Sequence, residues 1–155
     1  MSLNNIKIII PSYNCTNKFI SVIRKLRVNN ITSKIYIVDD NSSIRSKLII
    51  NFIKNKFSNI DVLTNNKNLG QGGSIKKAFK VLKKKDDLIC TMDDDGQHET
   101  KDVKKIINKA NKIYFNNHII FGSRELGFSK TPFNSYIGNK VSKFIFFLIT
   151  KKKII

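Results

Sequence analysis

Short apolar runs alternate along the chain with segments whose apolar residues recur at helical spacing. Strands are predicted where β-branched and aliphatic residues follow one another, over residues 6–10, 35–38, 60–63, 88–92 and 119–121. Helices are predicted where apolar residues are three and four positions apart, over residues 19–26, 44–52, 75–82 and 103–113. This alternation predicts an α/β fold in which a mostly parallel sheet is flanked by helices on both faces.

Polar motifs follow four of the predicted strands at the point where each strand ends. They occupy residues 11–14, 39–42, 93–98 and 122–124. In open parallel sheets, ligands bind beyond the carboxyl ends of the strands. Because these ends meet at one edge of the sheet, the motifs predict a ligand site at that edge.

The most informative motif is a run of three carboxylates, Asp93, Asp94 and Asp95, directly after a predicted strand. Like charges this close repel each other, and a divalent cation is the usual remedy. Acidic side chains one residue apart, with Gly96 beside them to let the backbone turn, suit a hard cation such as Mg²⁺ or Mn²⁺. Because such an ion commonly holds a phosphate, the motif predicts a metal and phosphate site.

Two simpler interpretations of this motif were weighed. A calcium-binding loop that starts at Thr91 fits poorly, because its first position is not acidic and a strand rather than a helix precedes it. A solvated acidic loop is the other alternative.

The motifs after the first two strands have both functional and structural interpretations. Tyr13 can line a pocket for a planar base, although its neighbours Pro11 and Asn14 also favour an ordinary turn. The carboxylate of Asp40 can accept hydrogen bonds from a ribose hydroxyl or a base N–H. We also expect Ser42 or Ser43 to cap the following helix.

The remaining motifs offer groups for binding anions. The glycine-rich residues 68–74 precede a predicted helix and can bring backbone amides toward an anion, or they form an ordinary turn that Ser74 caps. Arg124 follows the last predicted strand, where it can stabilise charge on a phosphate or simply pair with a surface acid.

Composition changes this picture only modestly. The chain has 155 residues, of which 41% are hydrophobic, so one domain with a substantial core is expected. Its formal net charge of +18 would ordinarily indicate nucleic acid or an anionic membrane. The lysines are spread along the chain without aromatic-and-arginine clusters, so we expect no nucleic acid as a partner. The charge still suits a protein beside anionic lipid or a polyphosphate.

Cysteine usage and the absence of targeting signals predict a cytoplasmic location. Cys15 and Cys90 lie in unrelated contexts, as is typical of reduced thiols. The first residues are polar and do not have the layout of a signal peptide. The apolar run at residues 144–149 is far shorter than the roughly 20 residues that a membrane-spanning helix needs.

Taken in order, the motifs resemble those of the family-2 glycosyltransferases with the GT-A fold, in particular the dolichol-phosphate mannose synthase-like branch. The matching segments are residues 11–14, 38–42, 68–70, 92–98 and 121–124. Five motifs in the same order across nearly the whole chain are far more specific than any one alone. The resemblance implies that a sugar is transferred, with inversion at its anomeric carbon, from a UDP- or GDP-linked donor to an acceptor.

The resemblance also implies roles for individual residues. Those that would line the donor site and hold its base and ribose are Pro11, Tyr13, Asn14, Asp40, Gly70, Asp93 and Asp94. Those that would hold Mg²⁺ or Mn²⁺ on the donor diphosphate are Asp93, Asp95 and Gln97. Asp95 and Arg124 would be the catalytic residues, because a metal ion and a guanidinium stabilise the charge that builds on the leaving nucleoside diphosphate.

Two features depart from the family pattern. Cys15 stands where many relatives carry Glu, so a polar contact is expected to be missing. The chain ends at Ile155, before an Asp and a Thr/Ser-Gly-Phe-Arg segment that relatives carry. We therefore expect a truncated catalytic domain, or alternatively a remnant that binds nucleotide sugars without transfer. No catalytic base is assigned, and an acceptor phosphate, which is already anionic, needs none.

We divide the chain into a donor-binding core, residues 1–125, and an amphipathic helical segment, residues 126–155. Apolar residues of this segment, among them Phe133 and Ile137, share one helical face with lysines around it. We interpret it as a peripheral contact with the inner face of the membrane, which suits a polyprenyl-phosphate acceptor as much as a glycan. A core helix left partly bare is an equal alternative.

Overall fold

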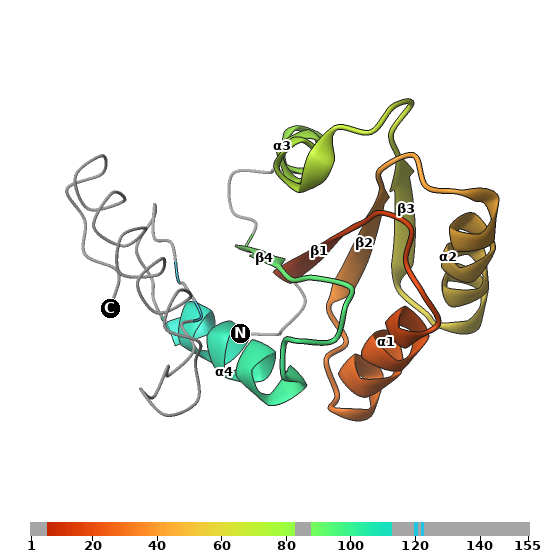
Figure 1. The fold of residues 1–155 in the computed structure, drawn as a ribbon. Coiled ribbons are helices and arrows are strands. Elements are labelled where there is room, and N and C mark those ends of the chain that lie inside the picture. Colours follow the sequence, from red (N-terminus) through yellow and green to blue (C-terminus); the bar gives the residue numbers. More distant parts are fainter. Residues whose placement is uncertain (1–5, 83–87, 113–119, 121, 123–155) are drawn as a thin grey trace, which may run out of the picture. The chain divides into compact units, whose positions relative to one another are not determined.

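The computed structural model describes residues 6–82, 88–112, 120 and 122 (Figure 1). All elements of the described residues lie within one compact unit, Met1–Tyr114. The strands are β1 (Ile6–Ser12), β2 (Lys34–Asp39), β3 (Ile60–Thr64) and β4 (Leu88–Thr91). The helices are α1 (Lys18–Val28), α2 (Ile44–Lys56), α3 (Gly70–Leu82) and α4 (Thr100–Lys112).

The strands form a parallel sheet in the order β3-β2-β1-β4. The chain therefore builds outward from β1 to β3 and then crosses back to place β4 on the other side of β1. This reversal makes the carboxyl ends of β1 and β4 a topological switch point, where open α/β sheets bind their ligands.

Helices cover both faces of the sheet, as the sequence predicts (Figure 1). On one face, α1, α2 and α4 contribute buried side chains such as Phe19, Ile53 and Ile107 to a core that includes Ile8 and Ile10 of β1. On the other face, Ala78 and Leu82 of α3 pack with Ile9 and Val38. Successive residues of β1 thus point to opposite faces, and both faces are apolar because both are covered.

The predicted elements are found with small shifts at their ends. The first strand was expected to stop at Pro11, but β1 continues to Ser12 beside β2. Proline is tolerated here because Ile9, two residues earlier, faces β4 and accepts the N–H of Met92. The missing N–H of Pro11 therefore faces the same side, where pairing with β4 has already ended.

Several expectations fall outside the described residues. They concern Arg124, the segment 126–155, and the fifth strand except for Ile120. The division into residues 1–125 and 126–155 therefore stays a prediction. Within the described part of the chain, no helix combines the length and hydropathy needed to cross a bilayer.

Both cysteines are free thiols, as expected. Burial raises the pKa of the Cys90 thiol to about 11, so this group stays protonated and unreactive at neutral pH. Cys15 faces α2, where its N–H donates to Ser46 Oγ at 3.0 Å and its Sγ lies 3.1 Å from the same oxygen. Cys15 thus links the β1–α1 connection to α2.

Replacing Ile23 of α1 by alanine should lower the free energy of unfolding by about 2–5 kcal/mol, because the side chain is fully buried and a cavity would remain. Val28→Ala in the same helix is the matched control. Val28 is 74% exposed, so its loss should change stability by no more than about 0.5 kcal/mol. Urea denaturation of both variants measures this, and equal effects would contradict the assigned core.

Candidate functional site

A buried carboxylate, Asp40, ties together three segments at the carboxyl edge of the sheet. Asp40 follows β2 and is 3% exposed. Its Oδ1 accepts hydrogen bonds from Asn65 Nδ2 at 2.7 Å and from the Leu69 N–H at 2.8 Å. Asn65 Nδ2 also lies 2.8 Å from Ser74 Oγ in α3. The end of β2, the β3–α3 connection and the first turns of α3 are therefore held in one arrangement.

These hydrogen bonds decide the charge of Asp40. Burial alone would raise the pKa of this carboxyl group, but the hydrogen bonds from Asn65 and Leu69, with further ones from Ser74 and Gly70, outweigh it. The pKa of Asp40 lies below its ordinary value, so the group is ionised at neutral pH. The Asp40 oxygen expected to face a ribose or base is thus engaged within the protein.

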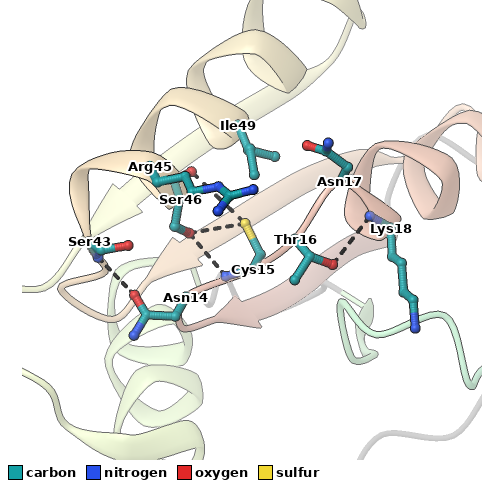
Figure 2. Close-up of a pocket in the computed structure, with 9 residues that line it drawn as sticks. All are labelled: Asn14, Cys15, Thr16, Asn17, Lys18, Ser43, Arg45, Ser46 and Ile49. Carbon is teal, nitrogen blue, oxygen red and sulfur yellow. Dashed lines mark hydrogen bonds between the residues drawn. The ribbon is translucent and has the colours of Figure 1, made fainter.

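The expected capping of α2 by a serine hydroxyl is wrong. α2 begins after Ser43, whose side chain makes no capping hydrogen bond. Both serines contact Asn14 instead: Asn14 Oδ1 accepts the Ser43 N–H at 2.8 Å, and the Asn14 N–H donates to Ser42 Oγ at 3.0 Å. Figure 2 shows the Asn14–Ser43 contact. The side chain of Asn14 therefore fixes the residue before α2 without capping the helix.

Of the two alternatives for the glycine-rich residues, the ordinary turn capped by Ser74 is wrong. α3 already begins at Gly70, so the glycine-rich stretch forms its first turn and Ser74 is a fully buried helical residue. The Gly70 N–H donates to Asn68 Oδ1 at 3.0 Å. Gly70 has a φ of +71°, which glycine adopts without strain. The first turn of α3 consequently lies next to the Asp40 contact.

The acidic motif after β4 meets the end of β1 at the switch point. Ser12 Oγ donates to Asp94 Oδ2 at 2.6 Å. Burial, opposed by the Ser12 hydrogen bond and aided by the charges of Asp95 and Asp93, raises the pKa of Asp94 above its ordinary value. The hydrogen bond to Asp94 therefore does not offset the cost of burying its charge, whereas the hydrogen bonds to Asp40 do.

Asp93 links the acidic motif to α3. Its Oδ1 accepts a hydrogen bond from Gln71 Nε2 at 2.6 Å. Its N–H donates to His98 Nδ1 at 3.2 Å, and the imidazole Nε2 lies 3.9 Å from Asp93 Oδ2. The first turn of α3 and the loop after β4 are thus joined across the switch point.

Asp95 is exposed, whereas Asp93 and Asp94 are partly buried. Its carboxylate is therefore the one of the three that an external cation can reach most easily. Its Oδ1 accepts the Gln97 N–H at 2.8 Å, which folds the loop back on itself. Gly96, with a φ of +80°, permits that turn. Within the described ranges, no three His, Cys, Asp or Glu side chains are grouped to hold a metal ion. One or two carboxylates nevertheless suffice for Mg²⁺ when substrate phosphates and water supply the other ligands, so the donor set of this loop fits such an ion.

The hollows of the described surface lie beside this edge rather than across it. A pocket of about 360 Å³ lies between the β1–α1 connection and the start of α2 (Figure 2), and of the predicted site residues it includes only Asn14. A second hollow of about 200 Å³ includes Asp95 and His98. Tyr13 is 56% exposed. We base the site on the hydrogen-bonded groups at the switch point, because neither hollow contains them together.

Four residues of this edge were not assigned roles from the sequence: Ser12, Asn65, Gln71 and His98. Each lies within or next to a motif that the sequence singles out. His98 lies 5 positions from its partner Asp93, but Ser12, Asn65 and Gln71 have partners that are distant in the chain, up to 82 positions for Ser12 and Asp94. Residue type and local spacing carry no signal for such pairs.

A parallel sheet covered by helices, with polar groups at its switch point, places the chain among the open α/β proteins that bind ligands at that edge. The sequence matches glycosyl transferase family 2 over residues 7–154, and the chain belongs to this family. The family assignment made from the motifs is therefore confirmed.

The curated relatives that are similar to this chain come from two organisms. A dolichyl-phosphate beta-glucosyltransferase of Trichomonas vaginalis is 27% identical over 81% of the chain and 41% of its own length. An uncharacterized protein of Methanocaldococcus jannaschii is 30% identical over 84% of the chain and 56% of its own length. The chain thus spans about half the length of the relatives it matches.

The structural similarities support the fold. A mannosyltransferase of Pyrobaculum calidifontis, solved with GDP-Man and Mn²⁺, aligns with a TM-score of 0.50 and 11% identity over 59% of this chain and 27% of that one. S. aureus TarS aligns with a TM-score of 0.51 and 21% identity over 69% of this chain and 20% of that one. Together with the parallel sheet, they show the GT-A fold expected from the sequence.

Asp40→Asn and Asp94→Asn should have opposite effects on stability. Asp40 Oδ1 accepts two N–H donors, from Asn65 and Leu69. If the asparagine turns its NH₂ toward them, donors face donors; if it turns its oxygen, the hydrogen bonds lose the charge that strengthens them. We therefore expect Asp40→Asn to lower the free energy of unfolding by about 1–3 kcal/mol at pH 7. Asp94→Asn keeps an acceptor for Ser12 and removes a repelled charge, so stability at pH 7 should be unchanged or higher.

The pH dependence follows from the same pKa shifts. The pKa of Asp40 is lower in the folded chain than in the unfolded one, so its contribution is present above the unfolded value of about 4 and is lost as the pH falls through the folded value. Asp94 has the opposite sign: its contribution is lost as the pH rises through its raised folded pKa. Urea denaturation between pH 3 and 7 checks this. If the loss of stability between pH 7 and pH 3 were the same in Asp40→Asn as in the unaltered chain, the lowered pKa of Asp40 would be contradicted.

Proposed function

We propose that this chain carries the donor-binding part of an enzyme that transfers a sugar from a nucleotide-diphospho-sugar to an acceptor with inversion. The observation that supports this most is the junction of Ser12, Gln71 and the acidic motif at the switch point of a family-2 fold. A buried, ionised Asp40 beside it keeps the edge rigid. Rigid positioning of this kind is what transfer chemistry requires.

A divalent cation, Mg²⁺ or Mn²⁺, is the cofactor we propose. Asp95 would hold it with Gln97 at the loop turn, and Asp93 would lie on the ribose side of the metal. Such an ion stabilises the charge that develops on the departing nucleoside diphosphate. The three adjacent carboxylates support this proposal, and Asp94 among them has one hydroxyl donor, Ser12, and a pKa that burial and the charges of Asp95 and Asp93 raise.

The proposed donor contacts differ in kind. Tyr13 is exposed and accessible to a base, whereas Asn14 and Asp40 are engaged with Ser43 and with Asn65. These two residues would therefore act chiefly by shaping the base and ribose pocket, with Pro11 and Gly70 supplying backbone at its wall. Arg124, the proposed second catalytic group, would contact a phosphate of the donor or the acceptor.

The relatives support the nature of donor and acceptor. The Pyrobaculum mannosyltransferase binds GDP-Man and Mn²⁺, and the Trichomonas relative is a dolichyl-phosphate glucosyltransferase. We therefore propose a UDP- or GDP-sugar as donor and a polyprenyl phosphate as the first acceptor to test, with a glycan as the second. A site at the cytoplasmic face of a membrane would suit such a lipid.

Nucleotide binding should depend on the metal and on Asp95. GDP or UDP with Mn²⁺ should raise the melting temperature of the chain, because a ligand at 100 times its Kd stabilises the folded state by about 2.7 kcal/mol. EDTA or Asp95→Asn should weaken binding about tenfold or more, since Asp95 is the proposed metal ligand. The matched control is Asp102→Asn, which removes an exposed acid of α4 outside the site.

The outcomes separate the alternatives. Metal-dependent binding that Asp95→Asn alone abolishes supports the donor site. Equal binding by both variants, or a melting temperature that no nucleotide changes, would refute it. Binding without turnover, when polyprenyl phosphate is supplied to the chain, would favour the non-catalytic remnant over the transferase.

A further inference from the structure

Helix α2 carries two apolar stripes rather than one. Its core stripe consists of Ile50 and Ile53, which are 2% and 0% exposed. The second stripe consists of Ile44, Leu48 and Phe52, which are 80%, 65% and 50% exposed. We call these three residues the outer stripe.

The outer stripe lies opposite the core. Residues four apart lie on one side of an α-helix, each about 40° further around the axis. On this spacing Leu48, the middle of the outer stripe, lies about 160° around the axis from Ser46, a buried residue of the core side. Figure 1 shows α2 beside β3 with its other side turned away from the sheet. The outer stripe therefore adds nothing to the core that α2 covers.

Cations border the outer stripe on both sides. Arg45 and Lys56 follow one border, about 20–40° around the helix axis from Phe52. Lys47 and Lys54 follow the other, about 60–80° from Ile44. α2 contains no acidic residue. Long basic side chains beside an apolar strip can lay their stems on hydrocarbon while the charged ends reach phosphates. An isolated core helix needs no such border.

We propose that the outer stripe of α2 docks on the surface of an anionic lipid bilayer. A helix with apolar side chains between basic flanks lies in the interface of such a membrane, and its attraction grows with the anionic lipid content. A second copy of the chain is a poor occupant, because each copy has a formal net charge of +18. Charge complementarity therefore selects the bilayer.

This surface adjoins the ligand edge of the sheet. Ile44, the first residue of the outer stripe, follows Ser43, whose N–H is bound by Asn14 at the end of β1. A bilayer that contacts α2 thus lies near the loop that Tyr13 and Asn14 form. The docking itself does not depend on the proposed transferase activity, and the contact differs from the one expected for residues 126–155.

Sedimentation of the full 155-residue chain with lipid vesicles tests the proposal. We expect the chain to bind vesicles that contain phosphatidylglycerol and to bind phosphatidylcholine vesicles at least tenfold more weakly, since lysines near an anionic surface contribute strongly. The double variant Leu48→Ser/Phe52→Ser should lose about tenfold in affinity for the anionic vesicles. Its matched control is Val28→Ser/Val81→Ser, which removes two apolar side chains that are 74% and 61% exposed on other helices.

A charge-matched pair separates docking from general attraction. Lys47→Gln/Lys54→Gln should weaken binding about tenfold, whereas Lys101→Gln/Lys104→Gln in α4, with the same net charge, should change it less than about threefold. Circular dichroism melts verify that each variant is folded. The proposal would be overturned if the chain bound no vesicles or bound both lipids equally. Equal losses of affinity in the α2 variants and their controls would also overturn it, because they would assign the contact to another segment.

Discussion

The carboxylate of Asp40 is the constraint on which the ligand edge depends. A buried charge is tolerated only when hydrogen bonds replace the water it has lost. Asn65 and the Leu69 amide supply them, so the chain after β3 has to return to the end of β2 before α3 begins. This return places Gln71 beside Asp93 on the far side of β1. One buried anion therefore positions three segments that are distant in sequence.

The two sides of the switch point treat negative charge in opposite ways. Hydrogen-bond donors around Asp40 lower its pKa. Burial, with a smaller contribution from the charges of Asp95 and Asp93, raises the pKa of Asp94, which has one hydroxyl donor. A structure that needed only stability would not place three adjacent carboxylates where they repel one another. In the proposed function Asp40 therefore has a structural role, and an external cation would complement the charge of Asp93, Asp94 and Asp95.

The sequence predicts the fold well because strands and helices follow from local periodicity, which each segment carries within itself. β1, with apolar residues on both faces, could be placed from its own composition. The partners of polar side chains could not. Ser42 or Ser43 was expected to cap α2, but the Ser43 side chain makes no capping bond, and Ser42 Oγ accepts the N–H of Asn14 from another loop. Ser74 was placed at a helix start because glycines precede it, yet those glycines are helical. A polar side chain can bond either to its own backbone nearby or to a group distant in the chain. Which partner it takes depends on the loops that the folded sheet brings together.

The outer stripe of α2 shows where periodicity carries more than fold information. Apolar residues at helical spacing predicted this helix correctly, yet only Ile50 and Ile53 of its apolar residues are fully buried by the core. Exposed leucine and phenylalanine gain nothing in water, and scattered ones need no explanation. Three in a row between basic flanks are not scattered: apolar contact and phosphate attraction become available together only at an anionic interface. Because α2 starts at the loop that carries Asn14, the same helix that closes the core also joins the ligand edge to the surface on which a lipid-linked acceptor would reside.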